Sequence, residues 1–331
     1  MNKINKAFNC KNIQLNNRLV MPPMATGKSE EDGKISKEII DYYDEKSKGG
    51  YISLIIIEHS FISDEGKASN RQLSIASDDM IEPLKELANT IHKNGSKAVM
   101  QMNHAGSAAS NEVTGLDIVG PSAIINPRIP NGEMPKELLI DDINGIIQNF
   151  KDAAIRVKAA GFDGVEIHSA HGYLLNQFFS PLTNKREDEY GGEVLSRIKI
   201  HLEVIKAVRE AVGEDFTILL RLGACDYRDG GSSIKDSVIA SKKFEEAGVD
   251  ILDISGGFCG YVNPENKEQG YFSEITEAIK KEVAIPVILT GGITDVVEAE
   301  RLLKDEKADL IGVGRAILKD SNWAKNAVDN K

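Results

Sequence analysis

Eight short runs rich in branched apolar residues constrain the fold of this chain more than any other feature. Runs such as Leu54–Ile57 are apolar throughout, as strands buried on both faces are. The runs that we predict as strands are Arg18–Met24, Ser53–Glu58, Ala98–Asn103, Gly164–His168, Thr217–Arg221, Asp250–Ile254, Val287–Thr290 and Leu310–Val313.

Between the strands lie segments whose apolar residues recur every three or four positions, which is typical of amphipathic helices. Such helices are predicted at Asp141–Ala160, Val194–Val212, Ile234–Ala247, Glu274–Lys281 and Asp295–Leu303. Strands that alternate with helices in this way form parallel βα units, so the fold class is α/β. The number of units favours a closed (β/α)8 TIM barrel.

The connections between the predicted elements support the barrel. Helix-to-strand connections are short, whereas three strand-to-helix connections are long, at Ala105–Leu139, Ser169–Gly192 and Gly256–Tyr271. Long loops at the C-terminal ends of strands are typical of an active-site face. A doubly wound sheet is the alternative, but it carries a glycine-rich fingerprint after its first strand, where this chain reads MPPMATGKS.

Composition excludes several classes of protein. The 331 residues are 41% hydrophobic and 27% charged, with a net charge of −11, which is typical of a globular protein and disfavours nucleic acid as a partner. Cys10, Cys225 and Cys259 lie far apart, so neither a disulfide framework nor a cysteine-held metal or iron–sulfur cluster is expected. No apolar run reaches membrane-spanning length and the N-terminal segment is polar, so we expect a cytoplasmic protein without a membrane partner. A homo-oligomer is compatible with the sequence.

Polar residues gather at the predicted strand ends, which would meet at one mouth of the barrel. His168 and His171 are followed by Tyr173, and two neutral imidazoles with a phenol suit the binding and protonation of a carbonyl compound. The HxxH spacing differs from zinc-binding motifs on helices, so we predict no metal. Arg221 either pairs with a carboxylate such as Glu166 or Asp253 or stabilises charge on a cofactor. Gln101 is either a packing amide or a partner for a ring with mixed edges.

Two glycine turns after the last two strands suggest a phosphate site. They read TGG at Thr290–Gly292 and GVGR at Gly312–Arg315. Backbone N–H groups in such turns attract an anion, and Arg315 adds a charged contact. One such loop would indicate only a tight turn, but the two together with Arg315 favour phosphate.

Several long motifs resemble the Old Yellow Enzyme family of FMN oxidoreductases. The resemblance covers nearly the whole chain, and its most specific part runs from HSAHGYLL to DEYGG. The motifs are NRLVMPPM at Asn17–Met24, QMNHAG at Gln101–Gly106, GFDGVEIHSAHGYLLNQFFSP at Gly161–Pro181, NKREDEYGG at Asn184–Gly192, TGGI, and ADLIGVGR at Ala308–Arg315.

The resemblance implies a role for each site residue. His168 and His171 would hydrogen-bond the carbonyl of an α,β-unsaturated substrate, and Tyr173 would protonate its α-carbon while hydride reaches the β-carbon. Arg221 would face the N1 side of the flavin. NADH or NADPH would supply the electrons. The flavin edges would be lined by Pro22, Pro23, Met24, Ala25, His59 and Gln101, and the FMN phosphate would be held by Gly291, Gly292, Gly314 and Arg315.

Departures from the family pattern also carry expectations. Ala25 stands where many members have Thr or Cys, so the flavin potential is expected to differ unless Thr26 compensates. Gly27 stands where bacterial ene-reductases often have a tyrosine, which suggests a roomier pocket. We expect residues 1–331 to form a single FMN-binding domain, without a C-terminal iron–sulfur or dinucleotide domain.

Other functions remain open at this stage. An FMN enzyme of this type can oxidise an amine or act as a general flavin or quinone reductase. A metal-dependent TIM-barrel hydrolase would use His168, His171 and a carboxylate, and a barrel that only binds a ligand is the last alternative.

Overall fold

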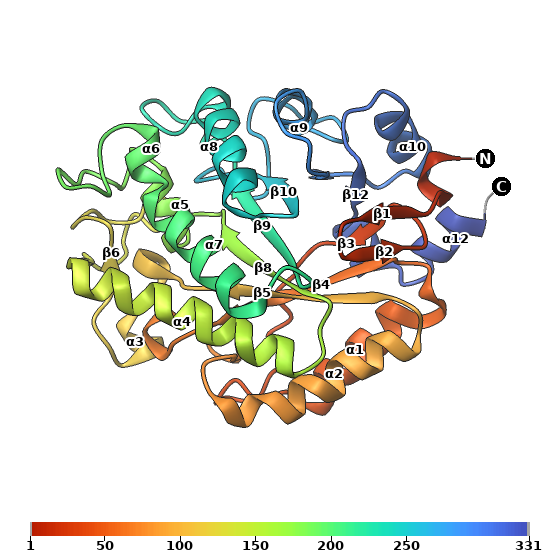
Figure 1. The fold of residues 1–331 in the computed structure, drawn as a ribbon, viewed down its shortest axis with the longest axis horizontal. Helices are drawn as coiled ribbons and strands as arrows, with labels where there is room; N and C mark the ends of the chain where they lie inside the picture. The colour runs from red at the N-terminus through yellow and green to blue at the C-terminus, as the bar shows by residue number, and fades with distance from the viewer. Residues whose placement is uncertain (1, 330–331) are drawn as a thin grey trace.

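Eight parallel strands close into a barrel in the computed structural model, which describes residues 2–329 (Figure 1). The order around the barrel is β10-β11-β12-β3-β4-β5-β8-β9. Ile311 on β12 pairs with Leu19 on β3, which joins the last strand to the first and closes the ring. The predicted (β/α)8 TIM barrel is therefore confirmed. The barrel strands are β3 (Leu19–Met21), β4 (Leu54–Phe61), β5 (Lys97–Asn103), β8 (Gly164–Ser169), β9 (Thr217–Gly223), β10 (Ile251–Ser255), β11 (Val287–Thr290) and β12 (Leu310–Gly312).

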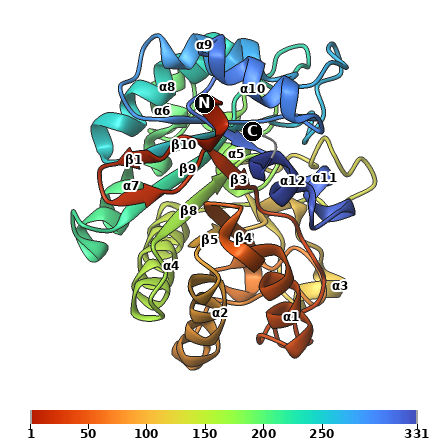
Figure 2. The ribbon, with the colours of Figure 1, turned by 90° about the vertical axis from the view of Figure 1, so that its right-hand side faces the viewer.

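Helices surround the barrel, as Figure 2 shows for α1, α2, α4, α8, α9 and α10. The long helices are α1 (Lys37–Ser47), α2 (Ile81–Lys93), α4 (Ile140–Ala159), α7 (Lys199–Val212), α8 (Ile234–Ala247), α9 (Ser273–Lys280) and α10 (Val296–Lys304). The short ones are α3 (Asn111–Thr114), α5 (Leu174–Phe179), α6 (Val194–Arg197), α11 (Arg315–Lys319) and α12 (Trp323–Asp329). Polar residues start several of them: Ser36, Ser233 and Asp295 each accept a hydrogen bond from the first turn of the helix that follows.

The predicted helix at Val194–Val212 is in fact two helices, α6 and α7. The chain departs from helical geometry at Ile198, whose ψ is 1°. Arg197 anchors α6 to the preceding loop, because its Nε donates to the Phe179 carbonyl at 2.7 Å and its Nη1 donates to the Gly192 carbonyl at 2.6 Å. Those bonds are made to residues outside the helical pattern, so periodicity alone predicts one continuous helix.

The inside of the barrel changes from apolar to polar along its axis. Side chains alternate between the two faces of a strand, so every second residue points inward. The strand residues that point outward pack beneath the helices. Both faces of each strand are therefore buried, which explains why the strand sequences are apolar throughout. The inward residues of the lower half form an apolar cluster of Val20, Leu54, Ile56, Val99, Leu219, Ile251, Ile288 and Leu310. Buried polar residues follow nearer the strand ends, including Glu58, Gln101, Glu166, Arg221 and Asp253.

An N-terminal hairpin closes the bottom of the barrel. Its strands are β1 (Phe8–Cys10) and β2 (Ile13–Leu15), which pair antiparallel. Cys10, Ile13 and Leu15 belong to the same apolar cluster as the barrel interior. The opposite, C-terminal face is left to the long loops, one of which contains the two-residue strands β6 (Val119–Gly120) and β7 (Lys136–Glu137). Within residues 2–329, no helix combines the length and the apolar character that crossing a membrane requires.

Candidate active site

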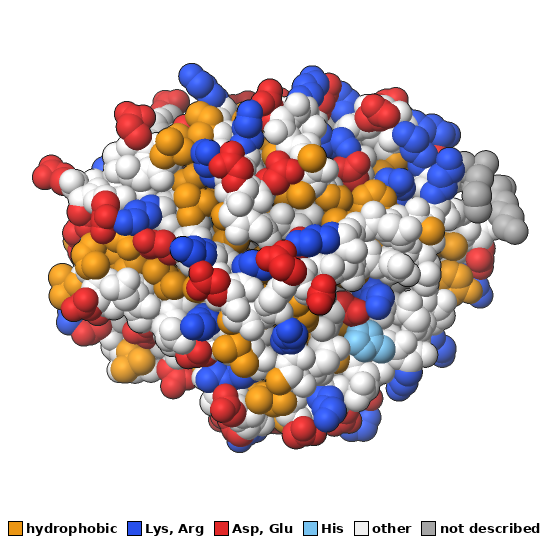
Figure 3. Space-filling view, viewed as in Figure 1, with side chains coloured by type: hydrophobic (Ala, Val, Ile, Leu, Met, Phe, Trp, Pro, Cys, Tyr) orange, Lys and Arg blue, Asp and Glu red, His pale blue; other side chains and the backbone are white. Residues whose placement is uncertain are grey.

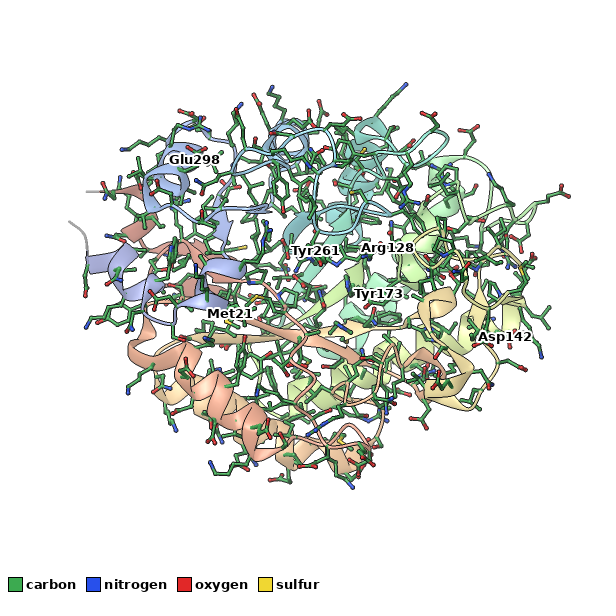
Figure 4. The ribbon with its side chains drawn as sticks, turned by 180° about the vertical axis from the view of Figure 1, so that it is seen from behind. Met21, Arg128, Asp142, Tyr173, Tyr261 and Glu298 are labelled. Atoms are coloured by element: carbon green, nitrogen blue, oxygen red, sulfur yellow. The ribbon has the colours of Figure 1, made fainter. Side chains whose placement is uncertain are left out.

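A cavity of about 420 Å³ opens at the C-terminal ends of the strands. Figure 4 shows Tyr173, Arg128 and Tyr261 together near the centre of the molecule, on the side opposite to that of Figure 1. Of the predicted site residues, only Gly291 does not line the cavity. Those that do are Pro22, Pro23, Met24, Ala25, His59, Gln101, His168, His171, Tyr173, Arg221, Gly292, Gly314 and Arg315.

His168, His171 and Tyr173 form one cluster of rings on the cavity wall. The His168 ring centroid lies 5.3 Å from that of His171 and 5.1 Å from that of Tyr173. The chain places them together because β8 ends at Ser169 and then turns sharply, with His171 at φ 60° and Gly172 at φ 77°. His171 Nε2 lies 2.7 Å from Ser255 Oγ at the end of β10, which orients the imidazole.

Burial decides the protonation state of these groups. It lowers the pKa of His168 well below its usual value, and the nearby His171 and Arg221 add to the effect. The pKa of His171 is likewise lowered, first by burial and then by Arg221. Burial lowers the pKa of His59 to about 4 and raises the pKa of Tyr173. At neutral pH the cavity wall therefore holds neutral imidazoles and a phenol that keeps its proton.

Arg221 and Gln101 sit in a buried polar layer below the cavity. Arg221 Nη1 lies 3.3 Å from Asp253 Oδ2, so its ion-pair partner is Asp253, not Glu166. Gln101 Nε2 donates to Glu166 Oε1 at 2.7 Å. Burial, together with the negative charge of Asp253, raises the pKa of Glu166 well above its usual value. Arg221 Nε and Nη1 nevertheless make no hydrogen bond within the described residues, which leaves this guanidinium able to bind a ligand atom.

The glycine turns form a cradle at the other end of the cavity. A Cβ on Gly292 would lie 2.5 Å from the Tyr271 ring, and one on Gly312 would lie 2.0 Å from Thr290 Oγ1. Arg315 lines this end and donates from Nη2 to the Tyr271 hydroxyl at 3.2 Å. Gly291 does not line the cavity. It packs against the same tyrosine, since a Cβ on Gly291 would lie 3.1 Å from the Tyr271 ring.

These features fit FMN. The glycine cradle with Arg315 suits the phosphate, and the guanidinium of Arg221, which lines the cavity, suits an electron-rich edge of the flavin ring. A metal centre has no comparable support, because no group of three or more His, Cys, Asp or Glu side chains is arranged as ligands anywhere in residues 2–329.

Thr26 does not take over the role expected of a polar residue at position 25. Its hydroxyl donates to Glu58 Oε2 at 2.7 Å, and its backbone N–H donates to Glu58 Oε1 at 3.2 Å. The side chain is thus held by a buried carboxylate, and Ala25 lines the cavity. Gly27, at φ 63°, has nothing within 4 Å of an added Cβ.

Sequence reasoning missed several residues that line the cavity. Arg128 and Tyr261 lie in the middle of long loops and belong to no motif that we recognised. The glycines at 291 and 292 indicate that something approaches the backbone closely, but the pattern does not identify Tyr271. Thr290 and Gly312 line the cavity within the two predicted glycine turns. The cavity-lining residues that were not predicted are Arg128, Tyr261, Tyr271, Ile293 and Leu318.

The NKREDEYGG motif supports the loops and lies outside the cavity. Arg186 is buried and donates from Nη1 to the carbonyls of Pro121 and Leu138, at 2.9 and 2.7 Å. Its Nη2 is 2.6 Å from Asp188 Oδ2. Gly191 must be glycine, because a Cβ there would lie 1.9 Å from the Arg186 carbonyl oxygen. The motif therefore ties the loop that carries Arg128 to the loop after β8.

Comparison with known proteins places the chain in a family. The model of the NADH:flavin oxidoreductase / NADH oxidase family matches residues 3–331. The chain is 41% identical over 326 residues to an NADH oxidase of Thermoanaerobacter brockii, covering 97% of this chain and 50% of that protein. It is 39% identical over 318 residues to an NADPH dehydrogenase of Clostridium acetobutylicum, and the match covers 96% of this chain and 92% of that protein.

Solved structures agree. A 2-naphthoyl-CoA reductase complex superposes with a TM-score of 0.94 at 24% identity, over 99% of this chain and 52% of that one, and this likeness shows the fold alone. Morphinone reductase in complex with tetrahydroNAD superposes with a TM-score of 0.84 at 25% identity, over 98% of this chain and 90% of that one. The chain thus spans about half the length of the NADH oxidase and of the naphthoyl-CoA reductase chain.

These findings confirm the resemblance, the FMN cofactor and NAD(P)H as the electron donor of the class. The chain belongs to the NADH:flavin oxidoreductase / NADH oxidase family.

Proposed function

We propose that this protein reduces the carbon–carbon double bond of α,β-unsaturated carbonyl compounds. The observation that carries the proposal is the cluster of His168, His171 and Tyr173 on the wall of one cavity, with ring centroids 5.1 to 5.3 Å apart around His168. FMN held in this cavity would supply the redox chemistry, which is hydride taken from NADH or NADPH and delivered to the β-carbon of the substrate.

The histidines bind and polarise the substrate in this proposal. Because their pKa values are lowered, both are neutral and each offers one N–H to the substrate's carbonyl oxygen. Both histidines line the cavity, so a ligand oxygen placed there can meet their rings. Drawing electrons toward that oxygen lowers electron density at the β-carbon.

Tyr173 supplies the proton. Burial raises its pKa, so the phenol carries its proton at neutral pH and gives it up when negative charge develops at the α-carbon. His59 lies against it, with ring centroids 5.4 Å apart. Gln72 Nε2 lies 2.6 Å from Nδ1 of His59 and holds that ring in place.

The alternatives have less support. An amine substrate is a cation at neutral pH, yet within residues 2–329 no Asp or Glu lines the cavity, whereas three arginines do. A hydrolase needs metal ligands that the described residues do not bring together. A quinone has a carbonyl oxygen that the same histidines can bind, so a quinone reductase must be separated by experiment.

The test is a visible spectrum of the purified protein under anaerobic conditions. We expect a flavin spectrum that bleaches when NADH or NADPH is added and returns when 2-cyclohexenone is added, with cyclohexanone as the product. Return of colour with benzoquinone or air but not with any enone would contradict the proposal and favour the quinone or oxygen reductase. A protein that neither retains nor takes up FMN would contradict the flavin chemistry itself.

A further inference from the structure

Arg128 stands at the mouth of the cavity, in the loop between β5 and α4. Its Nη1 donates to the backbone carbonyl of His171, and its backbone N–H donates to Asn126 Oδ1 at 3.0 Å. Asn126 is buried and its side chain donates to the Gly172 carbonyl at 3.0 Å. The arginine is therefore attached to the turn that presents the two substrate-binding histidines.

Two glycines leave room for this side chain. A Cβ on Gly172 would lie 3.1 Å from Arg128 Cδ, and a Cβ on Gly260 would lie 3.0 Å from Arg128 Nη2. Both glycines have positive φ, 77° and 74°, which other residues rarely adopt. The guanidinium is thus held between the loop after β8 and the loop after β10, and it lines the cavity beside Tyr261, which is 62% exposed (Figure 4).

The positive charge of Arg128 has no counter-charge. Among residues 2–329 no carboxylate lies within 4.0 Å of its guanidinium, and it makes no hydrogen bond other than that to the His171 carbonyl. The other two arginines of the cavity are accounted for, since Arg221 pairs with Asp253 and Arg315 contacts Tyr271 at the phosphate end. Although the chain has a net charge of −11, three arginines and, among the described residues, no Asp or Glu line the cavity, so it attracts anions.

We propose that Arg128 binds an anionic group of the substrate, and that the natural substrate is an α,β-unsaturated carbonyl compound with a carboxylate at the end remote from the reduced bond. The inference rests on the proposed function, because it takes His168 and His171 as the anchor of the carbonyl. A substrate held there points its far end toward the mouth, where Arg128 and Tyr261 lie. A guanidinium and a carboxylate make charge-assisted hydrogen bonds, about twice as strong as neutral ones.

The test uses two ligands that differ only in charge, 4-hydroxybenzoate and 4-hydroxybenzamide. Their phenol oxygens suit the histidines, and the carboxylate or amide then faces the mouth. Dissociation constants are measured on the FMN-loaded protein by calorimetry and by the change in flavin absorbance. We expect the benzoate to bind about tenfold more tightly than the benzamide, and Arg128→Met to abolish that preference. Partial exposure of Arg128 keeps the factor modest.

Arg228→Met is the matched control. Arg228 is exposed and its Nη1 also donates to a loop carbonyl, that of Pro127 at 3.1 Å, but it does not line the cavity. The ratio of the two dissociation constants should be the same in this variant as in the unaltered protein.

Three results would overturn the inference. If Arg128→Met leaves the ratio unchanged, Arg128 does not recognise the anionic ligand, and the proposed function still stands. If the ratio is unchanged but the KM for reduction by NADH or NADPH rises, the guanidinium holds a phosphate of the electron donor instead. If neither ligand binds to the unaltered protein, the histidines do not anchor an oxygen, and the proposed function fails together with this inference.

Discussion

Burial sets the protonation states of the histidines and the tyrosine in the cavity. The same HxxHxY residues on a solvated surface would hold imidazoles that are partly charged at neutral pH. Enclosure at the strand ends, with Arg221 close by, lowers the pKa values of His168 and His171 and keeps both neutral. Burial alone raises the pKa of Tyr173 and keeps its proton in place. The cavity wall therefore carries N–H donors and phenols, and no carboxylate among residues 2–329 lines it.

Replacement of Tyr173 by Phe tests the proton donor. We expect reoxidation of the reduced flavin by an enone to slow about 10²-fold, since a positioned general acid contributes that much. Flavin reduction by NADH or NADPH should continue, because hydride transfer to FMN needs no proton from this phenol. Stopped-flow absorbance separates the two half-reactions. Tyr190→Phe is the control, since the Tyr190 hydroxyl binds Glu203 at 2.9 Å, away from the cavity. Equal slowing of both half-reactions by Tyr173→Phe would exclude the proton-donor role.

The long loops are held over the barrel by buried side chains that bind backbone carbonyls and amides. Arg186 joins the loop at 105–139 to the loop at 169–192. Asp226 does the same on the other side: Oδ1 accepts from the Phe258 N–H at 2.7 Å and Oδ2 accepts from the Ser180 hydroxyl at 2.6 Å. Gly257 must lack a side chain, because a Cβ would lie 2.2 Å from Asp226 Oδ1. The loop conformations therefore depend on single charged residues.

Arg186→Met should loosen the loop that carries Arg128. The substitution leaves the Pro121 and Leu138 carbonyls and Asp188 without their donor, which costs about 3 kcal/mol of unfolding free energy. We expect faster hydrogen exchange and proteolysis within residues 105–139, while FMN remains bound. Lys185→Met, at an exposed neighbouring residue, is the control. Unchanged exchange in that loop would show that Arg186 does not hold it.

His201 joins several elements beneath the loops. Its Nε2 lies 2.8 Å from Ser169 Oγ at the end of β8, and its ring stacks on Phe244 of α8 with centroids 5.4 Å apart. Burial lowers its pKa from 6.5 to about 3. Below pH 6.5 the unfolded chain therefore binds a proton that the folded protein does not, and stability falls by about 1.4 kcal/mol per pH unit down to pH 3.

We accordingly expect His201→Gln to reduce the dependence of stability on pH. The free energy of unfolding in urea should fall less steeply between pH 7 and pH 5 than in the unaltered protein, by about one proton's contribution. The unfolding free energy should still fall with pH in this variant, because the pKa values of His59, His168 and His171 are lowered in the folded protein too. An unchanged slope would mean that His201 is already protonated in the folded state.

The molecule as a whole separates stability from chemistry along the barrel axis. The lower interior is an apolar cluster closed by the N-terminal hairpin, and the upper interior is polar and leads into the cavity. The charged surface in Figure 3 mixes lysines and arginines with acids over the visible face, so the net charge of −11 forms no single acidic patch there. The positive cavity is a local departure from the charge of the whole chain.

Leu15→Ala tests this separation. Leu15 is 2% exposed beneath the barrel, and loss of a buried leucine costs about 3 kcal/mol. We expect a lower unfolding midpoint with the same dissociation constant for 4-hydroxybenzamide on the FMN-loaded protein. Leu195→Ala, at a leucine that is 52% exposed, should change stability little. Loss of ligand binding by Leu15→Ala at a temperature where the protein stays folded would show that the two ends are coupled.

The sequence by itself determined the barrel and most of the residues around its mouth. Strand and helix periodicity are local properties, and in a parallel barrel every strand end faces the same way. Polar residues that end different strands, such as His168 and Arg221, therefore belong to one site by the pattern alone. The glycine turns at two such ends lie at the cavity as the pattern indicated, and their role in binding phosphate stays a prediction. That residues 1–331 make a single domain stays a prediction.

Only the tertiary structure decided how the loops complete the site. Arg128 enters the cavity because Arg186 and Asn126 hold its loop, Tyr271 covers Gly292, and Thr26 turns to Glu58. Each of these contacts joins residues far apart in sequence or depends on a buried partner, and no repeat or spacing records such a pairing. Loop conformations arise from the sum of these individual bonds, whereas strands and helices repeat one pattern along the chain.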